Sequence, residues 1–117
     1  MKPDGTPIFD CDEHDFRERV LATSHSTPVL VDFWADWCGP CLVLTPVLER
    51  VVAAFEGRVL LAKVEADENM RLAGHYRLRG FPTVLLFQHG EERARFHGAK
   101  PVHWVREFIE EHLGPNA

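Results

Sequence analysis

The stretch 29–41, VLVDFWADWCGPC, decides the fold of this chain. Its first part, 29–34, is almost continuously apolar, which is typical of a central strand covered on both faces of a sheet. Its last part carries two cysteines, Cys38 and Cys41, separated by a glycine and a proline. The segment 42–55 that follows has the apolar spacing of a helix. The stretch therefore predicts a buried strand, a tight turn that bears two thiols, and a helix directly after them.

Further strands and helices are predicted on both sides of this unit. Short apolar runs mark the strands, and apolar residues at helical spacing mark the helices. The predicted strands besides 29–34 are 8–11, 59–64, 84–87 and 93–96, and the predicted helices besides 42–55 are 12–22, 68–76 and 101–113. The order β-α-β-α-β-α-β-β-α predicts an α/β fold in which a central mixed five-stranded sheet is flanked by four helices.

Residues with strong local preferences set the limits of these elements. Asp12 is expected to cap the first helix. Gly57 is expected to end the central helix and Gly114–Pro115 the last one. Pro46 lies inside the central helix and is expected to kink it. His89–Gly90 is predicted to be the turn of a hairpin between the last two strands.

The length and composition predict a single domain over residues 1–117. The chain of 117 residues is 45% apolar and 26% charged, which is ordinary for a globular domain and far from the composition of a disordered chain. A chain of this length can bury one core but not two separate ones. Because no strong apolar stripe is left over once the elements are placed, we expect a monomer.

Charge and the composition of the N-terminal segment argue against two classes of partner. The formal net charge is −5, and no basic cluster is present that could follow a phosphate backbone, so nucleic acid is not an expected partner. The segment 1–5 is polar and no early apolar run follows it, so neither a secretory leader nor a membrane span is expected. We therefore expect a cytoplasmic protein.

The cysteine pair has the context that thiol–disulfide chemistry requires. Unpaired N–H groups and the dipole at a helix N-terminus stabilise negative charge, so Cys38 is expected to have a lowered pKa and to be the nucleophile. Cys41 lies one turn later and is expected to resolve the mixed disulfide formed on Cys38. Gly39 and Pro40 keep the turn tight, and the missing N–H of proline favours a reducing pair. Together with the missing leader, this disfavours a periplasmic oxidase or isomerase.

The cysteine pair has two other interpretations, a zinc site and a pair of inert buried residues. A tetrahedral zinc site needs four ligands. The chain has no second Cys-x-x-Cys and its seven histidines show no ligand spacing, so neither a metal nor another cofactor is expected. The remaining alternative is a pair of inert buried cysteines. Cys11, at the end of the first strand, is interpreted as a buried free cysteine that packs as a small apolar residue, with a regulatory thiol as the alternative.

Residues spread along nearly the whole chain form a pattern that is known from one family. They are 31–41, Pro46, Lys63, Asp67, 80–83, Gly90 and Gly98. With Trp-Cys-Gly-Pro-Cys after an apolar strand and Gly-x-Pro-Thr downstream, the chain resembles the thioredoxin family. The resemblance implies the thioredoxin fold and an enzyme, a thiol–disulfide oxidoreductase that reduces protein disulfides. It further implies electron transport in cell redox homeostasis, with a thioredoxin reductase as the partner that restores the dithiol.

The resemblance implies catalytic roles for two charged residues. Asp32 matches the family's buried carboxylate beneath the second cysteine, where desolvation raises its pKa and it takes the proton of Cys41 as that thiol attacks. Lys63 matches the lysine partner of that carboxylate. The alternatives are that Asp32 is a strand-end aspartate satisfied by solvent or by Lys63, and that Lys63 is a solvated strand residue.

The resemblance also implies a substrate-binding surface around Cys38. Pro82 matches the family's cis-proline, which sets the backbone of Phe81 beside Cys38 to pair with an extended substrate segment. Trp37 and Phe81 are expected to form an apolar lip around Cys38. The predicted substrate-binding residues are Trp37, Gly39, Pro40, Phe81, Pro82 and Gly98, with Gly80 also leaving room for a substrate backbone.

The sequence departs from the thioredoxin pattern directly after Cys41. The residue there is commonly lysine in the family but is Leu42 here, which makes the region more apolar. The segments 28–30, 41–49 and 78–84 are also similar to the N-terminal thioredoxin domain of the co-chaperedoxin family. In that family the domain precedes helical repeats and acts with chaperones on unfolded clients. The alternative function is therefore a chaperone-linked binding module for unfolded or partner proteins, with redox activity secondary.

Overall fold

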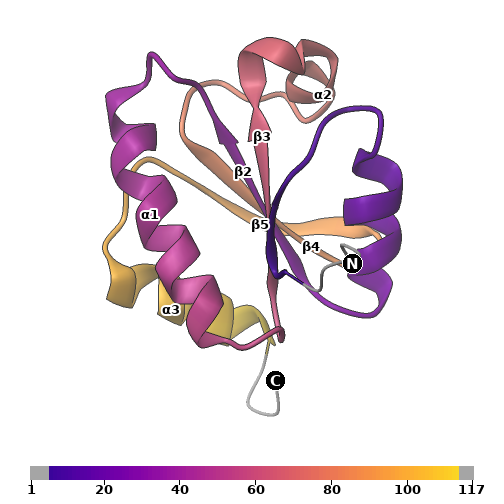
Figure 1. Cartoon of the computed structure of the whole chain (residues 1–117), viewed down its shortest axis with the longest axis vertical. Helices are drawn as coiled ribbons and strands as arrows, with labels where there is room; N and C mark the ends of the chain where they lie inside the picture. The colour runs from indigo at the N-terminus through magenta and orange to yellow at the C-terminus, as the bar shows by residue number, and fades with distance from the viewer. Residues whose placement is uncertain (1–5, 114–117) are drawn as a thin grey trace.

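The computed structural model describes residues 6–113, and its centre is a five-stranded sheet with the strand order β1-β3-β2-β4-β5 (Figure 1). The strands are β1 Ile8–Asp10, β2 Val29–Trp34, β3 Leu60–Glu65, β4 Thr83–Gln88 and β5 Glu91–His97. β1, β3 and β2 are parallel, whereas β4 runs antiparallel to β2 and β5 antiparallel to β4. The predicted mixed five-stranded sheet is confirmed.

The helical segments lie on both faces of this sheet. They are η1 Arg17–Ala22, η2 Thr23–His25, α1 Gly39–Ala54, η3 Ala66–Glu68, α2 Met70–His75 and α3 Val102–Leu113. In Figure 1, α1 and α3 lie to one side of the strands, with η1 and α2 to the other. Counting η1 as the first of them, the four predicted helices flank the sheet; η2 and η3 are single 3₁₀ turns.

Two apolar clusters hold these layers together. Alternate residues of a strand point to opposite faces of the sheet, so Leu30 joins the cluster beneath α1 and α3 while its neighbour Val31 joins the one beneath η1. Leu44 of α1 and Val105 of α3 belong to the first cluster, and Val20 of η1 to the second. Because β2 is covered on both faces, its sequence is almost continuously apolar, as predicted.

Element boundaries differ from the prediction mainly near capping residues. α1 begins at Gly39 rather than at residue 42, because Cys38 itself acts as the N-cap. At the first helix, Asp12 Oδ1 accepts hydrogen bonds from the backbone N–H groups of His14 and Asp15 at 2.8 and 3.1 Å. Asp15 Oδ1 accepts in return from the N–H of Asp12 at 2.9 Å. Asp12 therefore caps a separate turn. The prediction that it caps the first helix is wrong, because the helical segment η1 begins only at Arg17 and has Phe16 as its N-cap.

The hairpin between β4 and β5 has the predicted turn. His89 and Gly90 both have positive φ, 57° and 82°. Positive φ at both central residues matches the right-handed twist of the flanking strands. Gly90 lies close against His25, whose ring atoms would come within 2.7 Å of a Cβ at this position. The turn is therefore confirmed, and the positive φ at position 90 favours glycine there.

Two predictions depend on residues outside the described range. Gly114–Pro115, the expected end of the last helix, lies outside the described residues, as do parts of the expected single domain over 1–117. All five strands of the described residues belong to one sheet, and the single domain stays a prediction. Within residues 6–113, no helix is both long enough and apolar enough to cross a lipid bilayer.

Two leucines on α1 provide a matched test of the packing. Leu44 is fully buried between α1 and the sheet, whereas Leu42 is 59% exposed. We predict that Leu44→Ala lowers the free energy of unfolding by about 2–5 kcal/mol, because it removes buried apolar contacts and leaves a cavity. Leu42→Ala is expected to change it by no more than about 0.5 kcal/mol. Urea unfolding of both variants checks this, and similar losses would contradict the assigned packing.

Candidate active site

Cys38 lies at the N-terminus of α1, directly after the loop that follows β2. Its backbone is extended, with φ −95° and ψ 104°, and its Sγ accepts a hydrogen bond from the N–H of Cys41 at 3.2 Å. Pro40 occupies the first helical turn, where its missing N–H breaks no helical hydrogen bond. The Cys38 sulfur therefore sits where N–H groups and the helix dipole favour a thiolate.

The two cysteines form a disulfide in a small apolar cluster. Their Cα atoms are 5.3 Å apart, and 4% of Cys38 and 1% of Cys41 is exposed. Ala35 completes the buried cluster, and Trp34 and Phe81 pack against it. The pair can thus store or release two electrons in a place that is shielded from most of the solvent.

Trp37 and Phe81 form the predicted apolar lip. Their rings meet edge to face with centroids 6.0 Å apart. The indole of Trp37 is 64% exposed, and its Nε1 donates a hydrogen bond to Asp67 Oδ2 at 2.8 Å. The carboxylate of Asp67 therefore holds an otherwise exposed aromatic ring in place. Asp67 was part of the sequence pattern, but no sequence signal indicated this contact.

A groove lies beside Phe81. The peptide bond between Phe81 and Pro82 is cis, as predicted, and the carbonyl of Pro82 accepts a hydrogen bond from the N–H of Gly98 at 3.0 Å. The groove has a volume of about 390 Å³ and is lined by Arg79, Gly80, Phe81, Pro82, His97 and Gly98. A Cβ at Gly80 or Gly98 would meet nothing within 4 Å. Both glycines thus border open space that an extended chain can occupy.

Asp32 is fully buried in the middle of β2. Its Oδ2 accepts a hydrogen bond from Thr45 Oγ1 at 2.7 Å, while its Oδ1 has no hydrogen-bond partner among the described residues. Burial raises the pKa of Asp32 from 3.8 to about 6, opposed by the Thr45 hydrogen bond and the charge of Lys63. The predicted burial and raised pKa of this carboxyl are confirmed.

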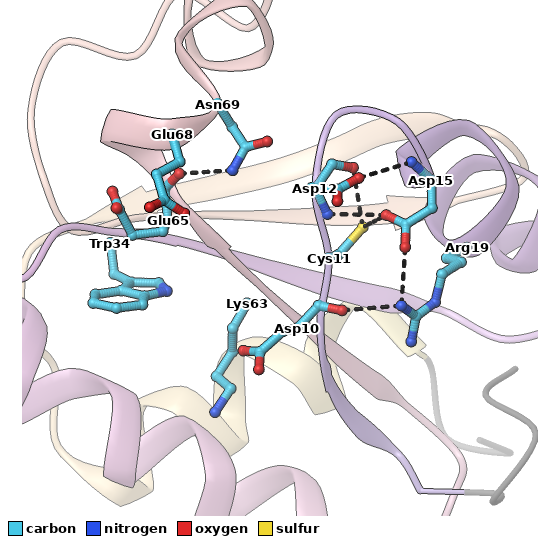
Figure 2. A pocket seen from close by; sticks show the side chains of 10 residues that line it. All are labelled: Asp10, Cys11, Asp12, Asp15, Arg19, Trp34, Lys63, Glu65, Glu68 and Asn69. Carbon is cyan, nitrogen blue, oxygen red and sulfur yellow. Dashed lines mark hydrogen bonds and ion pairs between the residues drawn. The ribbon is translucent and has the colours of Figure 1, made fainter.

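Lys63 does not form a hydrogen bond to Asp32. The two residues are register neighbours on β2 and β3, but Lys63 Nζ donates to Glu49 Oε2 of α1 at 2.8 Å. This hydrogen bond is the main reason why the pKa of Lys63 is raised. In Figure 2 the Lys63 side chain extends away from Glu65, which lies farther along the same strand. Lys63 acts on Asp32 through its charge alone, and its direct partner is Glu49.

Cys11 lies apart from the disulfide, at the edge of a polar pocket (Figure 2). It is 6% exposed, and its Sγ donates a hydrogen bond to Asp15 Oδ1 at 3.1 Å. Burial, reinforced by Asp15, raises the pKa of the Cys11 thiol far above its ordinary value. A thiol that stays protonated is a poor nucleophile. The interpretation of Cys11 as a buried free cysteine is confirmed.

Metal ligation finds no support in this geometry. Among residues 6–113, no three histidine, cysteine or acidic side chains gather in a way that could hold a metal ion. The pocket in Figure 2 is rich in acidic side chains, but Arg19 pairs with Asp15 at 3.0 Å and Asn69 donates to the backbone carbonyl of Glu65 at 2.8 Å.

Comparison with known proteins agrees with this architecture. The family model Thioredoxin matches residues 7–111. The chain belongs to the thioredoxin family. Its similarity to individual thioredoxins is also high and covers most of each chain, as two examples show.

One relative is "Thioredoxin" of Chlorobaculum thiosulfatiphilum, 39% identical over 106 residues, which are 91% of this chain and 96% of the relative. Another is "Probable thioredoxin-2" of Caenorhabditis elegans, 43% identical over 110 residues, which are 93% of this chain and 74% of the relative. With the Cys38–Cys41 pair at disulfide distance, this family membership identifies the chain as a dithiol–disulfide oxidoreductase with the thioredoxin fold. Protein disulfides as substrates and a reductase as partner belong to the same function in general terms.

The thioredoxin pattern did not reveal the direct partners of Asp32 and Lys63. Thr45 and Glu49, both on α1, contact Asp32 and Lys63 respectively. Thr45 follows Cys41 by four residues and Glu49 follows it by eight, so both lie near the helix face that Cys41 occupies. Their spacing was visible in the sequence, but their partners on β2 and β3 depend on how α1 packs on the sheet.

The raised pKa of Asp32 predicts a pH-dependent gain in stability on its removal. The pKa of Asp32 is 3.8 in the unfolded chain and about 6 in the folded protein. Between these pH values the folded protein therefore binds more protons than the unfolded chain. Its stability therefore falls as the pH rises through this window, by about 3 kcal/mol in total. Asp32→Asn is expected to stabilise the oxidised protein by about this amount at pH 8 but much less at pH 3.5.

Urea unfolding at the two pH values measures the difference, with Asp36→Asn as the control because Asp36 is exposed. Equal effects of Asp32→Asn at both pH values would contradict the raised pKa.

Proposed function

We propose that the reduced chain attacks disulfides of other proteins with Cys38 and completes the exchange with Cys41. The observation that carries this proposal is the position of the Cys38 sulfur at the N-terminus of α1, where it accepts the N–H of Cys41. That hydrogen bond and the helix dipole stabilise a thiolate, which is the attacking form. An equivalent donor at Cys41 is not needed for the first step, because Cys41 acts only after the mixed disulfide exists.

The exchange balances as two substitutions at sulfur. The Cys38 thiolate forms a bond to one sulfur of the target disulfide, and the other target sulfur leaves as a thiolate. Cys41 then gives up its proton and attacks the Cys38 sulfur, which releases the second target sulfur and closes the Cys38–Cys41 disulfide. The target gains two electrons and the chain loses two. A reductase must return them, and we propose that it is a thioredoxin reductase.

Asp32 is the proposed acceptor of the Cys41 proton. A carboxyl with a pKa of about 6 is mostly ionised at neutral pH and is a better base than an ordinary aspartate. Its unpaired oxygen has no competing donor among the described residues. Lys63, held by Glu49, contributes by its charge, which favours the ionised carboxyl.

The groove beside Phe81 is the proposed site for the target chain. An extended segment can form backbone hydrogen bonds along the cis turn, with one target sulfur brought against Cys38. Trp37 and Phe81, whose rings are in contact, supply apolar surface beside the groove, and Gly39 and Gly98 have open space where a Cβ would lie. Pro40 is the remaining residue of the proposed substrate-binding surface. Recognition of backbone rather than of side chains suits a carrier that must reduce several different proteins.

Compartment and assembly are part of the same proposal. A dithiol carrier that depends on a reductase works where thiols are kept reduced, so we propose the cytosol.

We also propose a monomer. Three of the four exposed large apolar side chains among the described residues, Trp37, Leu42 and Val43, lie in sequence beside the cysteine pair, where a transient target would cover them.

Substitution of each cysteine separates the two steps. We expect Cys38→Ser to abolish the acceleration of insulin reduction by dithiothreitol, followed as turbidity, because the nucleophile is lost. Cys41→Ser is expected to keep the first attack and to accumulate a mixed disulfide, seen as a conjugate by mass spectrometry under non-reducing conditions. Cys11→Ser is the control and is expected to react as wild type. Full activity of Cys38→Ser would overturn the proposal.

A second candidate function rests on the exposed apolar start of α1. Leu42 and Val43 are 59% and 62% exposed, and thioredoxins commonly have lysine at the position that Leu42 occupies here. Such a surface favours contact with unfolded or partner proteins, as a chaperone-linked binding module would need. We predict that Leu42→Lys weakens binding to a reduced, unfolded lactalbumin but leaves insulin reduction unchanged.

Ala53→Lys serves as the matched control, because it adds the same charge to an exposed position at the other end of α1. A protein in which Cys38 and Cys41 are both serine should still bind if binding is the primary function. Unchanged lactalbumin binding of Leu42→Lys would remove this second candidate.

A further inference from the structure

We propose that Thr45 is a positioning residue for the second exchange step: its hydroxyl holds one carboxylate oxygen of Asp32 and leaves the other free to take the proton of Cys41. This inference rests on the proposed function, since it concerns the same carboxylate and the same thiol. It adds a residue that the thioredoxin resemblance did not single out.

The helix places Thr45 and Cys41 in one line. Thr45 follows Cys41 by four residues in α1, so the two side chains lie on the same face, one turn apart. Thr45 Oγ1 reaches Asp32 Oδ2 of β2 at 2.7 Å. Because Cys41 is 1% exposed and Asp32 is fully buried, this face of α1 is the one turned toward the sheet. The carboxylate thus lies beneath the turn of α1 that joins the two residues.

Within residues 6–113, the Asp32 side chain accepts one hydrogen bond, from the Thr45 hydroxyl. Oδ1 is buried and unpaired there. The neighbouring cation does not reach the carboxylate, because Lys63 Nζ donates to Glu49. This one hydrogen bond therefore fixes the rotation of the Asp32 carboxylate. Oδ2 is held by Thr45, and Oδ1 is left as the free acceptor.

The choice of partner for the Thr45 hydroxyl supports a specific role. A threonine inside a helix commonly donates to the carbonyl four residues earlier, which here is that of Cys41. Thr45 instead donates to a carboxylate, and hydrogen bonds to a charged group are about twice as strong as neutral ones. The bond therefore favours the ionised form of Asp32, the form that can accept a proton.

All charged groups around Asp32 act on the same equilibrium. Lys63 on β3 lowers its pKa, Glu49 on α1 raises it, and the Thr45 hydrogen bond lowers it. On the other neighbouring strand the register partner is Val84, which carries no charge. Loss of the Thr45 hydroxyl is thus expected to raise the pKa of Asp32 further, which leaves less carboxylate at neutral pH, and to free the carboxylate to turn.

Thr45→Val removes the hydroxyl and keeps the branched shape, whereas Thr45→Ser keeps the hydroxyl. We expect Thr45→Val to slow release from the mixed disulfide by roughly 3- to 10-fold at pH 7 and to recover near wild-type rate at pH 9. Thr45→Ser should follow the wild-type pH profile. Attack by Cys38, measured as formation of the mixed disulfide, should be unchanged in both.

A direct readout of the carboxyl complements the rates. ¹³C-labelled aspartate followed by NMR reports the titration of Asp32, which should shift to higher pH in Thr45→Val and stay in place in Thr45→Ser. Thr23→Val is the matched control, because the Thr23 hydroxyl lies outside α1 and donates to the backbone carbonyl of Glu18 at 3.2 Å. If Thr45→Val does not fold, Thr45→Ala serves in the same two measurements.

The outcomes separate this inference from the proposed function. Identical pH profiles and identical Asp32 titrations for wild type, Thr45→Val and Thr45→Ser would overturn the role of Thr45 while leaving the cysteine mechanism intact. A uniform loss in Thr45→Val at every pH, with the Asp32 titration in place, would show a merely structural role and would equally overturn it. An active Cys38→Ser protein would instead refute the proposed function itself.

Discussion

The burial of β2 on both faces is the constraint on which the rest of this structure depends. Once 29–34 is enclosed by β3 and β4 at its edges and by helices above and below, everything attached to its end is fixed in space. α1 must start where β2 ends, so Cys38 meets the positive end of a helix dipole. The same burial places the carboxyl of Asp32 away from water and raises its pKa.

This arrangement lets one framework serve two sulfurs with different tasks. The Cys38 sulfur accepts a backbone N–H at the helix start, which is where a thiolate is favoured after reduction. The face of α1 that carries Cys41 also carries Thr45, whose hydroxyl donates a hydrogen bond to the buried carboxyl of Asp32, the proposed base. Neither effect needs a metal or a bound cofactor, because both follow from where one strand and one helix meet.

Sequence reasoning succeeded where a property is local. The strands and the hairpin turn at 89–90 follow from periodicity and from residues with strong backbone preferences. The family pattern correctly led to the buried Asp32 and to the cis bond before Pro82. Two predictions differ from the structure. α1 starts at Gly39 and not at residue 42, because a cysteine caps it, and the amine of Lys63 donates to Glu49 and not to Asp32.

The sequence by itself determined the order of elements, the cysteine pair at a strand–helix junction and the family. Each of these depends on spacing along the chain, and spacing can be read directly. Only the tertiary structure decided which donor reaches Asp32, that Asp67 holds Trp37, and that burial, reinforced by Asp15, keeps Cys11 protonated. These contacts join residues on different elements or turns, and small rotations of a packed helix change hydrogen-bond partners without changing any sequence pattern.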